Sequence, residues 1–427
     1  MERAGAVSDR SGTSGFTGHW RLSKTTTFWS LALILLMLVF GSAAASPLYR
    51  VYQAQFHFSA TMLSGVFAIY VLALLVALLF FGAVSDYLGR LPVIISAIAF
   101  SGAGCVVFLT ADSVAALFVA RFLQGISVGL ASSAIGAALF DLQPAGSQRA
   151  SLVTSAFSTL GLALGALISS VLIQYAPAPT HLIWWVLLAV FASGIVTVLA
   201  MEEPGTRRPG VVASLRPTIS VPRQARAAFA GAIPCTVAVW ALGGLYLSLG
   251  PSLAALATGS PSSVWGGLAT FAFRSMPARS AMLRGSGFLI AGLSLTLFAI
   301  ATTTAAAFLA GTAVAGVGFG LAFSGAFRMT TAQAAPGQAA GLVAAIFVVN
   351  YVAFSVPALI AGVATTYLGL QSTALAYAAV LGLLIVVAVG VLLLRGDKLP
   401  RSAPALRGVM PPGPCTCHPC VRALDAV

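Results

Sequence analysis

Charged residues are scarce in this chain of 427 residues, where Asp, Glu, Lys and Arg together make up 7% of the sequence. A soluble domain carries about 25%. Acidic residues are the scarcest, with nine Asp and Glu against 22 Lys and Arg. Hydrophobic residues account for 59%, and the mean hydropathy is +1.00. The composition excludes an ordinary soluble domain and predicts an all-α polytopic membrane protein.

The chain has only five cysteines, which are too few and too scattered for a secreted disulfide framework. Three of them, Cys415, Cys417 and Cys420, crowd the C-terminal end beside His418. These residue types bind metals, but their spacing matches no standard zinc pattern. We therefore predict a disordered tail, no metal site and no cofactor, with a metal-binding tail as the alternative.

Signatures of enzymes are also missing. The sequence shows no ATP-binding P-loop, no metalloprotease motif and no soluble enzymatic domain. The stretch Gly125-Ile126-Ser127-Val128-Gly129 fits the nucleophile elbow of hydrolases, but that motif needs a strand before it and a helix after it. Here it lies within an apolar run, where Gly-x-x-x-Gly allows close helix packing. We expect no enzymatic activity and no catalytic residue.

Long apolar runs dominate the rest. The first covers about residues 27–46 and is expected to end at Pro47, although its Ala43-Ala44-Ala45 also fits a signal-peptide cleavage site. Similar runs follow in two groups on either side of a basic, Pro-containing segment. The predicted organisation is an N-terminal tail (1–25), a six-helix bundle (26–201), a cytoplasmic linker (202–227), a second bundle (228–394) and a disordered basic tail (395–427).

The positions of the basic residues predict the orientation. With an even number of helices and a cytoplasmic N-terminus, all Lys and Arg except Arg50 and Arg121 fall on the cytoplasmic side. This asymmetry accounts for the net charge of +13 without a nucleic-acid partner. We predict a monomer in the inner (plasma) membrane with both termini in the cytoplasm.

The two halves echo each other. The stretch from Gly125 to Ala131 resembles the stretch from Gly316 to Ala322, and repeated halves are how many secondary transporters are built. Pro47 precedes Gly125 by 78 positions, whereas Pro251 precedes Gly316 by only 65. The missing 13 residues coincide with a short apolar run at 264–273, so the eighth of twelve helices is predicted to be truncated.

A short polar hairpin separates the second and third apolar runs. Its Gly82, Asp86, Gly89 and Arg90 have the spacing Gly-x-x-x-Asp-x-x-Gly-Arg. This resembles the signature loop between helices 2 and 3 of the major facilitator superfamily. The resemblance implies a fold of two six-helix bundles and a cytoplasmic latch formed by Asp86 and Arg90. The alternative is an ordinary polar turn.

Two further charges are candidates for coupling or substrate binding. Arg121 precedes spaced glycines as in the family's helix 4 motif, and a charge at that depth is costly unless it is partnered. It either faces the central cavity, where it binds an anionic group or helps proton coupling, or extends to the outer surface. Asp141 is the best remaining titratable group. Its alternative is a solvated helix-end charge near Arg149.

Polar and aromatic residues in the apolar runs are candidates for the cavity. The resemblance implies that helices 1, 4, 7 and 10 line it. The alternative is that these groups only bond neighbouring helices. The candidates are Ser42, Gln124, Trp240, Tyr246, Ser324 and Asn350, with Tyr351 beside them.

The resulting prediction is a secondary active transporter of a small organic, hydrophobic or amphipathic solute, working by alternating access. Efflux and facilitation both fit, and protons are a candidate coupling ion. The rival prediction is a non-transporting relic or membrane sensor, because the truncated eighth helix would abolish the transport cycle.

Overall fold

The computed structural model describes residues 21–144, 147, 149–207, 209–210, 221–248, 277–302, 304–333 and 339–394. These residues form helices and connecting turns, with no strand among them. Eleven of the helices are long and apolar enough to cross a membrane. The prediction of an all-α polytopic membrane protein is confirmed.

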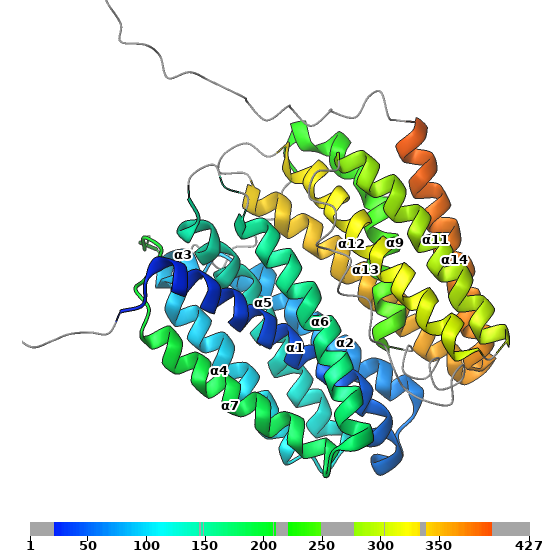
Figure 1. The fold of residues 1–427 in the computed structure, drawn as a ribbon, viewed down its shortest axis with the longest axis horizontal. Coiled ribbons are helices and arrows are strands. Elements are labelled where there is room, and N and C mark those ends of the chain that lie inside the picture. The colour runs from blue at the N-terminus through cyan, green and yellow to red at the C-terminus, as the bar shows by residue number, and fades with distance from the viewer. Residues whose placement is uncertain are drawn as a thin grey trace, which may run out of the picture.

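Six long helices and one short helix make up the N-terminal half, drawn from blue to green in Figure 1. They are α1 (Lys24–Phe56), α2 (Ala60–Phe81), α3 (Ser85–Leu88), α4 (Arg90–Leu109), α5 (Val114–Leu142), α6 (Arg149–Tyr175) and α7 (Pro179–Leu199).

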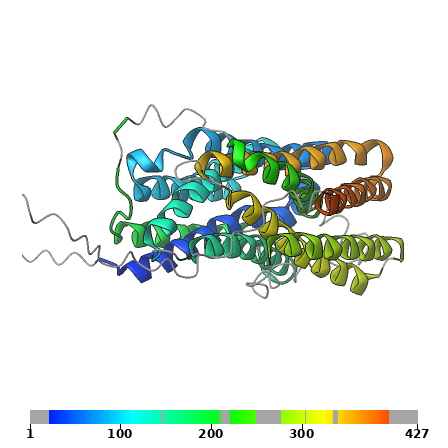
Figure 2. The ribbon, with the colours of Figure 1, turned by 90° about the horizontal axis from the view of Figure 1, so that it is seen from above.

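The C-terminal half contributes five long helices to the described part of the chain. They are α9 (Arg226–Ser248), preceded by the single turn η1 (Arg223–Ala225), then α11 (Ala278–Thr302), α12 (Ala305–Thr331), α13 (Ala339–Leu368) and α14 (Leu370–Leu394). The predicted truncated helix at 264–273 lies outside the described residues, as does the C-terminal tail. The axes of the helices in both halves are roughly aligned with one another, as the second view shows (Figure 2).

The first helix extends beyond the apolar run 27–46 at both ends. It begins at Lys24, where the Ser23 hydroxyl caps it by accepting a hydrogen bond from the backbone N–H of Thr26. It also continues past Pro47 to Phe56, so Pro47 does not end it and Arg50 is helical. Membrane helices tolerate an internal proline when neighbouring side chains satisfy the backbone groups around it.

Small residues set the spacing of the helices in the N-terminal half. A Cβ on Gly125 would lie 2.3 Å from the Tyr70 carbonyl oxygen, and one on Gly129 would lie 2.5 Å from Ala77 Cβ. Between the neighbouring helices α6 and α1, a Cβ on Gly165 would lie 2.3 Å from the Phe40 carbonyl oxygen. These glycines therefore bring α5 against α2 and α6 against α1.

The two halves meet along α2 and α13. The rings of Phe67 and Phe354 are 5.1 Å apart, and Phe354 is buried in the N-terminal core cluster. Trp240 and Tyr351, both in the C-terminal half, also pack against that cluster. The boundary between the halves is therefore lined by aromatic side chains from the C-terminal half.

Candidate functional site

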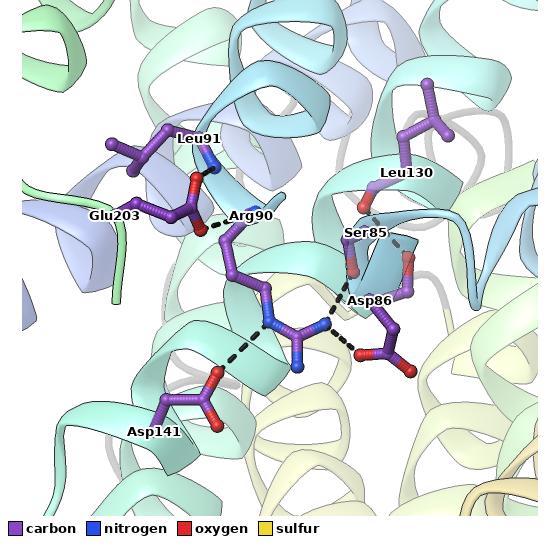
Figure 3. A network of polar contacts seen from close by, with 8 residues as sticks. Ser85, Asp86, Arg90, Leu91, Leu130, Asp141 and Glu203 are labelled. Atoms are coloured by element: carbon purple, nitrogen blue, oxygen red, sulfur yellow. Dashed lines mark hydrogen bonds and ion pairs between the residues drawn. The ribbon is translucent and has the colours of Figure 1, made fainter. Parts of the chain in front are cut away.

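A network of polar contacts joins three segments at one end of the N-terminal half, and Arg90 is at its centre (Figure 3). Its Nη1 donates to Ser85 Oγ at 2.8 Å and pairs with Asp86 one helical turn earlier. Its Nε donates to Asp141 Oδ2, at the end of α5, at 3.0 Å. The guanidinium thus ties the α2–α4 hairpin to α5.

The backbone of the hairpin has a partner that sequence analysis missed. Glu203, which follows α7, accepts hydrogen bonds from the backbone N–H of Arg90 at 2.6 Å and of Leu91 at 3.2 Å. A carboxylate at a helix N-terminus satisfies free N–H groups and interacts favourably with the helix dipole. Glu203 therefore caps α4 and attaches the segment after α7 to the same network (Figure 3).

The two glycines of the hairpin differ in what they contribute. Gly89 has a φ of +105°, and a Cβ there would lie 2.7 Å from Glu203 Oε2. Only glycine adopts that backbone without strain and admits the carboxylate. Gly82 follows α2 with a φ of −57°, which any residue adopts, but a Cβ there would lie 2.3 Å from the Leu78 carbonyl oxygen.

Asp141 is an exposed charge at a helix end, as one of the two sequence-based interpretations expects, but its partner is Arg90 and not Arg149. It lies at the surface end of the bundle, at the end of α5, and its carboxylate pairs with Arg90. All three ion pairs among the described residues lie at that end of the bundle. Two involve Arg90, and the third joins the exposed side chains of Arg21 and Glu202. Asp141 is therefore a third member of the hairpin network.

Arg121 lies inside the bundle, with 2% of its surface exposed. Its Nη1 donates to the Ser42 carbonyl oxygen and to Gln124 Oε1, both at 2.8 Å. No carboxylate pairs with it in the part of the chain that the structure describes. Its placement favours the interior interpretation over extension to the outer surface.

The backbone of α1 supplies acceptors to this buried cluster. Gln124, 1% exposed, donates from Nε2 to the Gly41 carbonyl oxygen at 3.2 Å. Ser169 Oγ on α6 donates to the Ala44 carbonyl oxygen at 2.7 Å. Pro47 removes the N–H that would bond the carbonyl four residues earlier, and the preceding turn accepts side-chain donors from α5 and α6. Ser42 contributes its carbonyl, while its hydroxyl donates to Val39.

Two tyrosines flank the guanidinium of Arg121. The Tyr70 ring on α2 lies 4.0 Å from the guanidinium carbon, and the Tyr49 ring on α1 lies 5.9 Å from it. Rings at such distances attract a cation through their negative faces. The cluster holds a positive charge in an apolar bundle by means of carbonyls, an amide and aromatic rings.

An aromatic cluster surrounds Trp240 in the C-terminal half. Its ring is 5.3 to 6.0 Å from four other aromatic rings, carried by α12 and α13. With the Asn350 amide oriented to suit its neighbours, Asn350 accepts a hydrogen bond from Trp240 Nε1 at 3.3 Å. The four rings are those of Phe319, Phe323, Tyr351 and Phe354.

The two clusters lie on opposite sides of the boundary between the halves. Tyr70, which covers Arg121, is one helical turn from Phe67 on α2. The Phe67 ring lies 5.1 Å from the Phe354 ring at a tilt of 45°, and Phe354 lies 5.8 Å from Trp240. The structure therefore brings Arg121, Gln124 and Ser42 near the aromatic cluster.

Tyr246 and Ser324, the other two cavity candidates, form hydrogen bonds within the C-terminal half. The Tyr246 hydroxyl forms a hydrogen bond of 2.8 Å with Thr296 Oγ1, which joins α9 to α11. Ser324 Oγ donates to the Leu321 carbonyl oxygen within α12. Among the described residues no group of three His, Cys, Asp or Glu could hold a metal ion, and Cys415, Cys417 and Cys420 lie outside them.

The comparisons with known proteins agree with this architecture. The family model described as Major Facilitator Superfamily matches residues 31–353. The chain belongs to the major facilitator superfamily. Comparison with curated proteins finds no match.

Solved structures share the superfamily fold. One is a mutant of the peptide transporter POT in complex with sulfate, with a TM-score of 0.69 and 15% sequence identity over 90% of this chain and 96% of that one. Two further structures of this mutant, the second in complex with alafosfalin, give TM-scores of 0.68 and 0.67 at 15% identity. Membership in this superfamily, which is one of transporters and not of enzymes, supports membrane transport.

Proposed function

We propose that this superfamily member is a secondary active transporter that moves a small organic, hydrophobic or amphipathic solute by alternating access. It works as an exporter or a facilitator in the inner (plasma) membrane, as a monomer with both termini in the cytoplasm. The solute binds between the two halves. Peptide transport belongs to the POT neighbours, and at 15% identity they support the fold alone.

The observation that carries this proposal is the buried charge of Arg121. A guanidinium that is 2% exposed and has no carboxylate partner among the described residues is costly in an apolar bundle. Such groups within membrane-spanning helices typically serve a solute or a coupling ion. Gln124 and the α1 carbonyls hold Arg121 beside the boundary between the halves, where a solute would bind.

The Arg90 network supplies the latch. Two carboxylates from different segments, those of Asp86 and Asp141, share this guanidinium. Asp86, Arg90 and Asp141 all belong to the N-terminal half, so the latch acts by fixing the hairpin against α5. In the proposed cycle the ion pairs hold one conformation and loosen in the other. Because Asp141 pairs here, it serves the latch rather than proton coupling.

Transport in proteoliposomes tests the proposal. The full chain is reconstituted and supplied with a panel of neutral, cationic and anionic amphipathic solutes, with and without an imposed pH gradient. We expect saturable movement of one class that protein-free vesicles lack, and a dependence on the gradient would identify protons as the coupling ion. Correctly inserted protein that moves no solute would favour the relic or sensor alternative.

A further inference from the structure

Two buried hydrogen-bond donors, one on Arg121 and one next to it, lack an acceptor. Arg121 Nε has no acceptor, although its Nη1 serves two. The Tyr49 hydroxyl interacts with the same guanidinium, and no acceptor takes the proton of the hydroxyl. A buried donor without an acceptor destabilises a fold, so such groups call for an explanation. Both donors belong to one cluster of positive charge.

The missing partner matches the chemistry of a carboxylate. A carboxylate only accepts hydrogen bonds, and its two oxygens suit one N–H and one O–H donor. It would also supply the negative charge that Arg121 lacks among the described residues. Charge-assisted bonds of this kind are about twice as strong as neutral ones. A cationic solute would meet repulsion here, and a neutral one would leave the charge uncompensated.

The ring of Tyr70 covers the guanidinium, at 4.0 Å. The two unpartnered donors are closed off from solvent in this conformation. Tyr70 is on α2, the helix that contacts the C-terminal half through Phe67 and Phe354. A carboxylate therefore reaches Arg121 only after the side chains that cover it, Tyr70 among them, have moved.

The rest of the solute is indicated by the aromatic cluster across the boundary. Trp240, Phe319, Phe323 and Tyr351 are each partly exposed within the bundle, and their rings lie at angles between 41° and 80° where they meet. Edge-to-face and tilted arrangements of this kind favour a further aromatic ring. No acidic residue lies among them to attract a cation.

We propose that the solute is an aromatic monocarboxylate. Arg121 Nε and the Tyr49 hydroxyl bind its carboxylate, and the rings around Trp240 bind its aromatic body. This inference rests on the proposed transport function and names the substrate class of the same site.

Binding measured by calorimetry on the purified full chain in detergent tests the inference. The probes are 2-naphthylacetate and its neutral isostere 2-naphthylacetamide. We expect the wild type to prefer the acid by about tenfold or more, since a lost charge-assisted bond costs at least that factor. Arg121→Gln and Tyr49→Phe should reduce this preference. Trp240→Leu should weaken the binding of both probes to the same extent.

Controls separate folding from recognition. Arg50→Gln removes an exposed arginine from the same helix as Tyr49 and should leave the preference unchanged. Tyr49→Phe removes a hydroxyl whose proton has no acceptor, so the variant should fold even if Arg121→Gln does not. Equal affinity of the wild type for acid and amide, or no binding of the acid, would overturn the inference.

The inference and the proposed function fail in different ways. If the reconstituted protein transports another class of solute and does not bind the acid, the substrate class is wrong and transport stands. If the protein binds the acid with the expected preference yet moves no solute of any class, the binding site stands and transport is wrong.

Discussion

Arg90 Nε lies 3.0 Å from Asp141 Oδ2, although the two residues are 51 positions apart in the chain. The same guanidinium pairs with Asp86 from the other side. A single cation thus holds two carboxylates from different helices, and neither carboxylate is fully exposed. Because Asp86 and Asp141 share Arg90, the effect of replacing one of them depends on whether the other is present.

Asp86→Asn and Asp141→Asn should each slow transport with normal membrane insertion. We expect a reduction of about three- to tenfold for each, because a partly exposed ion pair contributes on the order of 1 kcal/mol. The double variant should lose less than the product of the two single losses, since both acids use Arg90. The measurement is the initial uptake rate into vesicles. Unchanged flux in both single variants would count against the latch.

Glu203→Gln should lower the thermal stability of the protein. It weakens two hydrogen bonds to the N-terminus of α4 that depend on a negative charge, which we expect to cost ~1 kcal/mol. Glu202→Gln is the matched control, because its partner Arg21 and Glu202 itself are more than half exposed. The check is the midpoint of thermal unfolding in detergent. Equal shifts for the two variants would refute the capping role.

Gly125→Ala should reduce the yield of folded protein. The added methyl would meet the Tyr70 backbone at 2.3 Å, so α5 and α2 would have to separate, at a cost of about 1–3 kcal/mol. Gly136→Ala, on the same helix, meets nothing within 4 Å and serves as the control. Size-exclusion chromatography of detergent extracts would show the difference, and similar profiles would argue against close packing at Gly125.

Tyr246→Phe should affect stability and leave solute recognition unchanged. The Tyr246 hydroxyl bonds Thr296 and joins α9 to α11, which supports the structural alternative for this residue. We expect a loss of about 1 kcal/mol in stability, the usual contribution of one such bond. Parallel measurements of thermal unfolding and of the concentration for half-maximal transport would separate the two roles. A large change in the latter would return Tyr246 to the cavity.

Much of the fold could be predicted from the sequence because bilayer-length apolar runs are a strong signal. The hairpin charges Asp86 and Arg90 were predictable from their spacing, which places them one helical turn apart. Asp141 and Glu203 were not assigned to the same network. Their contacts with Arg90 join distant segments, and neither residue has a local spacing that indicates its partner.

The path of α1 shows a second limit of prediction from the sequence. A proline after an apolar run of membrane length reads as the end of a helix, yet Pro47 lies inside α1. Neighbouring helices supply donors to the turn before the proline, Arg121 to the Ser42 carbonyl and Ser169 to the Ala44 carbonyl. That information belongs to tertiary packing. The depth of Arg121 follows from the same contacts.

Alternating access is the central claim, and fixing the two halves together tests it most directly. The variant Phe67→Cys with Phe354→Cys places one thiol on each side of the boundary, where the two rings now lie 5.1 Å apart. A short reducible cross-linker joins them in a background without other cysteines. Phe327→Cys with Phe347→Cys, both in the C-terminal half, is the control. The account predicts that cross-linking across the boundary stops transport, that reduction restores it, and that the control pair transports in both states. Unimpaired transport with the halves cross-linked would contradict it.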